Sequence, residues 1–190
     1  MKRWIAILLL AVLLLGVLPA KAENKYSRNI FGYFDTVTTV MGYTDSQEKF
    51  DRICTQTEKQ LEYYHRLFDG YHSYPDMHNL WYLNQYAAAA PIQVDDAFFA
   101  LLSACKDMQT AHSKVNIAMG SVLALWHDAR EVGILPSADS LAAANLHTDF
   151  SCVELDAENK TVFFTDPELK LDLGAVAKGY TADQVKEYLY

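Results

Sequence analysis

The sequence predicts an α+β fold in which helices pack on a mainly antiparallel sheet. Apolar residues recur at helical spacing in residues 46–69, 95–108 and 175–190, which predicts three amphipathic helices. Residues 33–44 and 152–166 are instead rich in threonine, valine and aromatic residues or alternate between apolar and polar, as strands do. With 190 residues, 51% of them hydrophobic, the chain can bury the core of one domain or form part of a larger one.

The chain begins with a pattern typical of a secretion signal. Two basic residues precede an apolar stretch over residues 4–18, which is too short to span a bilayer comfortably. Ala20 and Ala22 then give the small-x-small pattern of a cleavage site. We therefore expect a signal peptide over residues 1–22 and a mature domain over residues 23–190, with an uncleaved membrane anchor as the alternative. Such a signal implies export to the periplasm or another extracytoplasmic space, with membrane association if it stays uncleaved.

The charge balance is acidic. Removing Lys2, Arg3 and Lys21 with the signal peptide takes a net charge of −8 to about −11. A surface of this sign repels polyanions, so we exclude nucleic acid as a partner.

Three cysteines are spaced far apart along the chain. Cys54, Cys105 and Cys152 form no CxxC motif and no Cys/His metal spacing. Cys54 and Cys105 fall on apolar helical faces, which predicts buried thiols. An oxidising compartment would still permit one pair to bridge, and the sequence does not choose between pairings.

The first half of the chain divides into a strand and three helices. Residues 33–44, "YFDTVTTVMGYT", predict a strand, and Ser46 is a candidate N-cap for the long helix that follows. A tyrosine-rich stretch then predicts an ordered loop with a short helix near residues 79–84. Asp95 is the expected cap of the next helix.

In the second half of the chain two helices come first, and the spacing of apolar residues then changes from helical to alternating. A helix is expected from about Ser121, after an irregular stretch, and a short helix from Ser137 or Asp139. The remaining predicted elements are a β-hairpin over residues 152–166, a short strand over residues 169–173 and a helix over residues 175–190.

The segment "LKLDLGAVAKGYTAD" places an unusual set of residues where that last helix begins. A lysine near a helix N-terminus is unfavourable, because the N-terminal N–H groups carry a partial positive charge. Gly174 permits a backbone conformation that other residues avoid. Ala175 and Ala177 leave the N–H groups of the first turn unshielded, so a phosphate or pyrophosphate would be stabilised there, with Lys178 as a second contact. Asp172 would accept hydrogen bonds from a ligand or help to attract a metal. Gly179 predicts close packing against another backbone.

A purely structural interpretation stands beside this one. Junctions in which a strand, an aspartate and a glycine lead into a helix are common. In that interpretation Asp172 caps the helix, and Lys178 pairs with Asp183 or faces solvent.

The same segment resembles the D-L-G-[GA]-[IV]-A-K-G-[YF] signature of the ApbE family, the FAD:protein FMN transferases. Three more stretches are similar to that family's motifs and follow in its order: "YFDTVTTVMGY", "LFDGYHSYPDMHNLWYLNQ" and "VNIAMGSVLALWHDA". The resemblance covers about residues 30–190. It implies an ApbE-like, T-fold-like architecture of which this chain, apparently truncated, is the N-terminal portion.

The resemblance implies an enzyme that acts on a flavin nucleotide. Members of the family bind FAD with a divalent metal, usually Mg²⁺, and cleave the FAD pyrophosphate. They attach FMN through a phosphoester to a threonine of an acceptor flavoprotein, such as a subunit of a membrane redox complex, and release AMP. The alternatives are an exported protein that binds or hydrolyses FAD for flavin scavenging, and an inactive fragment.

The motif match also assigns expected roles to single residues. Asp172 would hydrogen-bond FAD, Lys178 would contact it near its phosphates, and Ala175 would give its backbone carbonyl to the metal. Tyr74 matches a tyrosine that lies against a ring of the cofactor. Phe34 would form an apolar wall of the FAD pocket.

A second stretch carries departures from the family pattern. Lys114, Val115 and Asn116 belong to a segment expected to touch the cofactor, and Asn116 stands where most members have an aspartate. His127 and Asp128 replace a glycine and a phenylalanine. Adjacent helix residues point in different directions, which argues against a catalytic pair there.

The remaining metal ligands of the family belong to its C-terminal half. Nothing in these 190 residues matches them. We therefore expect this chain by itself to bind metal poorly and to transfer little or no FMN.

Overall fold

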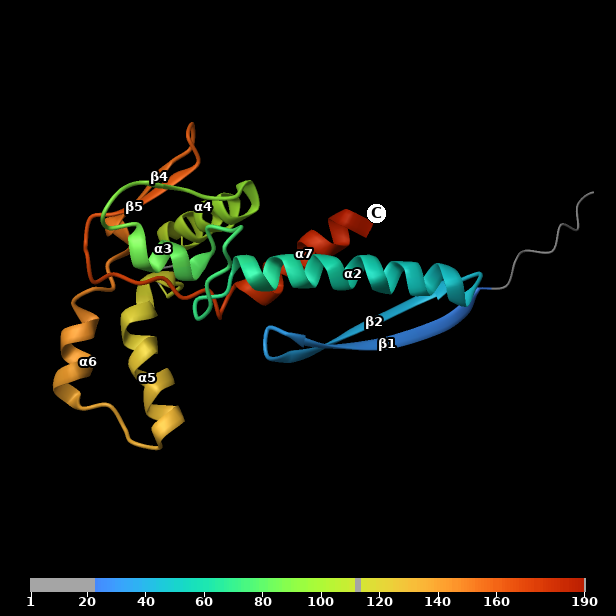
Figure 1. Cartoon of the computed structure of the whole chain (residues 1–190), viewed down its shortest axis with the longest axis horizontal. Helices are drawn as coiled ribbons and strands as arrows, with labels where there is room; N and C mark the ends of the chain where they lie inside the picture. Colours follow the sequence, from blue (N-terminus) through green and yellow to red (C-terminus); the bar gives the residue numbers. More distant parts are fainter. Residues whose placement is uncertain (1–22, 112–113, 190) are drawn as a thin grey trace, which may run out of the picture.

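A computed structural model describes residues 23–111 and 114–189; the predicted signal peptide lies outside these residues. In chain order the elements are β1 (Asn24–Tyr33), β2 (Thr36–Thr44), α2 (Gln47–Leu67), α3 (Leu80–Tyr86), β3 (Ile92–Gln93), α4 (Asp96–Ala111), the 3₁₀ turn η1 (Ile117–Met119), α5 (Gly120–Val132), α6 (Ala138–Asn145), the 3₁₀ turn η2 (Phe150–Cys152), β4 (Val153–Asp156), β5 (Thr161–Phe164) and α7 (Ala177–Leu189). Figure 1 shows the β1–β2 hairpin running along α2 and away from β4 and β5.

The first sheet is an antiparallel hairpin of β1 and β2. Phe34 and Asp35 form its turn with φ values of 55° and 50°. The prediction of one strand over residues 33–44 is therefore wrong at its start, because the chain reverses where that strand was placed. β1 was missed because its mixed polar sequence lacks a strand pattern, and pairing with β2 is what makes it a strand.

Side-chain caps set the helix starts as the sequence predicts. Ser46 accepts a hydrogen bond from the Lys49 N–H at the start of α2, and Ser137, not Asp139, does the same for α6. Asp95 accepts one from the N–H of Ala97 at the start of α4. The long α2 packs against both strands of the hairpin and against α7.

The second sheet has the order β3-β5-β4 and is antiparallel. The predicted β4–β5 hairpin is confirmed, whereas the two-residue β3 is too short to leave a sequence pattern. The predicted strand over residues 169–173 is wrong: the segment is extended but has no strand beside it. Its leucines are buried as the alternation predicts, since Leu169, Leu171 and Leu173 are each no more than 2% exposed.

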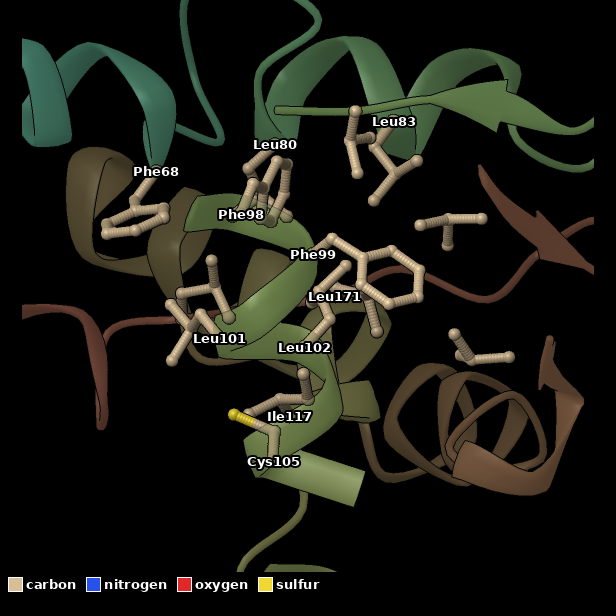
Figure 2. Packing of buried hydrophobic residues seen from close by; sticks show 14 of the residues in the cluster. Phe68, Leu80, Leu83, Phe98, Phe99, Leu101, Leu102, Cys105, Ile117 and Leu171 are labelled. Atoms are coloured by element: carbon tan, nitrogen blue, oxygen red, sulfur yellow. The ribbon is translucent and has the colours of Figure 1, made fainter. Parts of the chain in front are cut away.

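The core lies between α4, the second sheet and the ends of α2 and α3 (Figure 2). It is largely aliphatic and aromatic, and its largest fully buried side chains include Phe98, Phe150, Phe164, Leu83 and Leu102. Cys54 and Cys105 are buried free thiols, as predicted. Burial raises the pKa of Cys105 to about 11, which keeps this thiol neutral and unreactive.

None of the helices within residues 23–111 and 114–189 has the length and apolar character needed to cross a bilayer.

Candidate functional site

A cleft of about 640 Å³ opens where the hairpin turn, the C-terminal end of α2, α3, α5 and residues 170–178 meet. Its walls bring together side chains from elements far apart in the sequence. Among the predicted site residues, Phe34, Asp172 and Lys178 line it. Clefts of this size with a few convergent polar groups are typical of small-molecule sites.

The start of α7 forms one wall. Lys178 is exposed in the first turn, and its side chain has no hydrogen bond and no ion pair with any described residue, so the alternative pairing with Asp183 does not occur. One oxygen of Asp172, Oδ1, accepts the N–H of Gly174 at 2.8 Å. Asp172 thus stabilises the turn before α7, whereas the structural interpretation predicts that it caps the helix itself, and its other oxygen has no hydrogen bond among the described residues.

The glycines of this segment differ from expectation. Gly174 has no positive φ; its lack of a side chain matters because a Cβ would lie 3.0 Å from Oδ1 of Asp172. The prediction of close backbone packing at Gly179 is wrong, since a Cβ there would meet nothing within 4 Å. The close approach occurs at Gly120, where a Cβ would lie 2.6 Å from the carbonyl oxygen of Lys170.

The extended segment before α7 is held by three separate elements. The N–H of Gly120 donates to the Lys170 carbonyl at 3.0 Å, and the N–H of Asp172 donates to the Ile117 carbonyl at 2.8 Å. Between them, Leu171 is bonded through both its N–H and its C=O to the side-chain amide of Asn84, at 2.8 and 2.9 Å. These bonds replace the strand ladder that the sequence predicted.

An aromatic and basic cluster forms another part of the wall. The rings of Tyr71 and His127 lie 4.5 Å apart between centroids, and Nη2 of Arg130 is 3.0 Å from Nδ1 of His127. Partial burial, and next the negative charge of Asp172, raise the pKa of Tyr71, and both residues line the cleft. Sequence reasoning did not find Tyr71 or Arg130.

A buried carboxylate holds the loop that carries Tyr71. Asp69, whose side chain is 5% exposed, accepts hydrogen bonds from the N–H groups of Tyr71 and His72, from the His72 ring and from the Tyr74 hydroxyl. Burial alone would raise the pKa of Asp69, but these hydrogen bonds outweigh it and lower the pKa.

Tyr74, the predicted ring contact, does not line the cleft. Its hydroxyl is bonded to Asp69 at 3.0 Å, and the Arg66 guanidinium lies 4.7 Å from its ring centroid. Tyr71, three residues earlier, occupies the wall. Residue type does not separate these two tyrosines; only the path of the loop does.

The predicted contact segment 114–116 also lies away from the cleft. Asn116 caps η1 by accepting the N–H of Ala118 at 2.9 Å, and its Nδ2 donates to the Thr148 carbonyl at 2.8 Å. Both polar atoms of the Asn116 side chain are therefore already hydrogen-bonded within the protein. Lys114 is exposed and Val115 is half-buried.

Ala175, the predicted metal contact, lies in the turn before α7. Within the described residues its carbonyl accepts no hydrogen bond, and no group of three His, Cys, Asp or Glu side chains is placed to hold a metal ion.

A smaller apolar cavity of about 340 Å³ adjoins the cleft, because Phe34 and Lys178 line both. It lies between β2, α2 and α7. Thr57 and Thr181 line it, and each has a buried hydroxyl without a hydrogen-bond partner among the described residues.

The motif residues, the α+β fold and the cleft can be compared with known proteins. The sequence model of the ApbE family matches residues 34–190. The chain belongs to the ApbE family. This confirms the family predicted from the sequence motifs.

Two curated ApbE relatives are named FAD:protein FMN transferase. The protein from Klebsiella pneumoniae is 34% identical over 108 residues, which are 56% of this chain and 34% of that relative. The protein from Treponema pallidum is 34% identical over 113 residues, 56% of this chain and 31% of that relative. The match thus spans about a third of the length of each.

Solved ApbE structures share the fold. The ApbE protein of Thermotoga maritima superposes with a TM-score of 0.71 at 22% identity, covering 86% of this chain and 52% of that one. The flavin transferase ApbE of Vibrio cholerae gives a TM-score of 0.73 at 18% identity, covering 88% and 53%. The predicted α+β class is thereby confirmed, and this chain spans about half of either solved protein.

Proposed function

We propose that the cleft binds the flavin nucleotide of an FAD:protein FMN transferase. The observation that carries the proposal is Lys178, a cation without an ion pair among the described residues, in the first turn of a helix that opens on the cleft. Its charge and the helix N–H groups repel each other unless an anion lies between them. The pyrophosphate of FAD is such an anion, and the curated relatives are named for that substrate.

The rest of the cleft suits the other parts of a dinucleotide. The free oxygen of Asp172 is an acceptor for a ligand N–H or hydroxyl. Tyr71 and His127 offer planar faces on which a heterocycle can stack, and Arg130 adds a second positive charge. Phe34 gives the apolar contact that the sequence predicts.

The proposed reaction is cleavage of the FAD pyrophosphate, with FMN moving to a threonine hydroxyl of an acceptor flavoprotein and AMP leaving. The resemblance adds Mg²⁺ to this reaction. Ala175 has a carbonyl that accepts no hydrogen bond among the described residues and is available as one ligand of such an ion. The proposed site of action is outside the cytoplasm, in keeping with the predicted signal peptide.

FAD binding tests the proposal directly. The exported chain is titrated with FAD, with and without Mg²⁺, and flavin fluorescence is followed. We expect saturable binding that weakens about tenfold or more in Asp172→Ala and in Lys178→Ala, since each removes a charge-assisted contact of about 1.4 kcal/mol or more. Lys186→Ala, on the same helix but outside the cleft, is the control. Absence of FAD binding by the unaltered chain would overturn the proposal.

Product analysis separates transfer from the hydrolytic alternative. The chain is incubated with FAD, Mg²⁺ and a threonine-bearing acceptor domain. AMP together with FMN-modified acceptor supports the transferase, whereas AMP with free FMN supports FAD hydrolysis and flavin scavenging.

A further inference from the structure

The side chain of Asn84 takes the place of a neighbouring β-strand for one residue beside the cleft. It sits in the last turn of α3, and its Nδ2 donates to the Leu171 carbonyl at 2.9 Å. Its Oδ1 accepts the Leu171 N–H at 2.8 Å. The two residues are 87 positions apart in the sequence.

Only an amide side chain can do this. An asparagine presents one donor and one acceptor in a plane, as a peptide group does, while aspartate offers only acceptors and alanine offers neither. Leu171 is 2% exposed, so its N–H and C=O would be left without partners if Asn84 were lost.

The contact acts on the residues that face the ligand. Leu171 directly precedes Asp172, and the carbonyl of Leu173 accepts the N–H of Ala177, which starts α7. Fixing Leu171 therefore fixes where the Asp172 carboxylate and the first turn with Lys178 stand. Asn84 itself also lines the cleft.

We propose that Asn84 is a positioning residue for the nucleotide site, acting through Leu171 on Asp172 and Lys178. This inference rests on the proposed function. It assigns Asn84 the task of holding the anion-binding turn at its place in the cleft, separate from any contribution to the stability of the core.

Two measurements on Asn84→Ala and Asn84→Asp test the inference. Amide hydrogen exchange is followed at Leu171 and Asp172, and FAD affinity is measured by flavin fluorescence well below the unfolding temperature. We expect faster exchange at Leu171 in Asn84→Ala and FAD binding weakened by about tenfold in both variants. Asn84→Asp keeps the acceptor for the Leu171 N–H but loses the donor to the Leu171 carbonyl, and it carries the FAD measurement if the alanine variant does not fold.

A control variant separates the positioning role of Asn84 from a general loss of protein stability. Val162→Ala removes a fully buried side chain of β5 that does not line the cleft, so it should lower the melting temperature without changing FAD affinity. If the unaltered chain binds FAD and both Asn84 variants bind it equally well, despite faster exchange at Leu171 in Asn84→Ala, the positioning role is wrong and the proposed function survives. If the unaltered chain binds no FAD, the proposed function fails and this inference fails with it.

Discussion

Gly120 and Lys170 meet backbone to backbone. The N–H of Gly120 donates to the Lys170 carbonyl at 3.0 Å, and a Cβ on Gly120 would lie 2.6 Å from that same oxygen. The first residue of α5 is therefore pressed against the segment that leads to Asp172. No side chain fits between the two, so the distance from α5 to this wall of the cleft depends on glycine.

Substituting Gly120 by alanine should push the 170–172 segment away from α5. Because the atoms that a Cβ would strike are backbone, they cannot rotate aside, and we expect a loss of about 1–3 kcal/mol in the free energy of unfolding. FAD binding should weaken too. Gly179→Ala is the matched control, since its Cβ has open space and alanine favours a helix. Chemical denaturation measures both variants, and equal behaviour of the two would contradict the structure.

Tyr71 and Tyr74 should differ in their effect on FAD binding. Tyr71→Ala removes a face of the cleft wall, and we expect an affinity loss of about tenfold, in the range of one ring contact. Tyr74→Ala removes a ring that packs on Arg66 and does not line the cleft, so its FAD affinity should fall less. Fluorescence titration of the two alanine variants compares the two rings. A larger loss for Tyr74→Ala would restore the tyrosine that the sequence motif selected.

Replacing either of the two threonines whose buried hydroxyls lack a hydrogen-bond partner among the described residues, Thr57 and Thr181, by valine should stabilise the fold. Valine has nearly the shape of threonine, and Thr181 is 1% exposed with its hydroxyl unpaired among the described residues. Thr181→Val should therefore raise the free energy of unfolding by about 1 kcal/mol. Thermal unfolding followed by circular dichroism measures this. Thr110→Val on the exposed side of α4 is the contrasting variant, because its hydroxyl does have a partner, the Lys106 carbonyl, and its loss should give no gain in stability. A destabilised Thr181→Val would mean that its hydroxyl has a partner.

Asp69 should make the fold sensitive to acid. Its pKa in the folded protein is lowered from the ordinary 3.8, so the folded state favours the carboxylate more than the unfolded state does. The resulting stability is fully present above about pH 4 and is lost as the pH falls from 3.8 through the lower native pKa. Each unit of lowering corresponds to about 1.4 kcal/mol.

Denaturation midpoints measured between neutral pH and about pH 2.5 test this dependence. In Asp69→Asn the neutral-pH stability should be lower and the decline in acid shallower, because the amide does not titrate. Asp139→Asn, on the exposed start of α6, should keep the normal decline. An unchanged profile for Asp69→Asn would show that other carboxylates cause the acid sensitivity.

Some features of the fold can be predicted from short stretches of the sequence. Ser46 and Ser137 cap their helices because a short hydroxyl side chain next to an apolar-periodic run satisfies N-terminal N–H groups. The β4–β5 hairpin follows from alternation and a turn between two short runs. The segment around Lys178 can be identified in the sequence because a cation at a helix start is locally unfavourable.

Other features depend on contacts between distant parts of the chain. The 169–173 segment alternates like a strand, yet whether it is one depends on a partner, and the tertiary structure supplies Asn84 in place of a strand. Tyr71 and Tyr74 are of one type in one loop, and the hydrogen bonds to Asp69 decide which of them faces the cleft.

The sequence by itself determined the class of fold, the helices with their caps and the family, because these follow from periodicities and motifs within short windows. Only the tertiary structure decided how the cleft is built. Its walls meet through backbone contacts such as Gly120 with Lys170 and through side-chain pairing across 87 residues, and no local pattern encodes which distant groups will become neighbours.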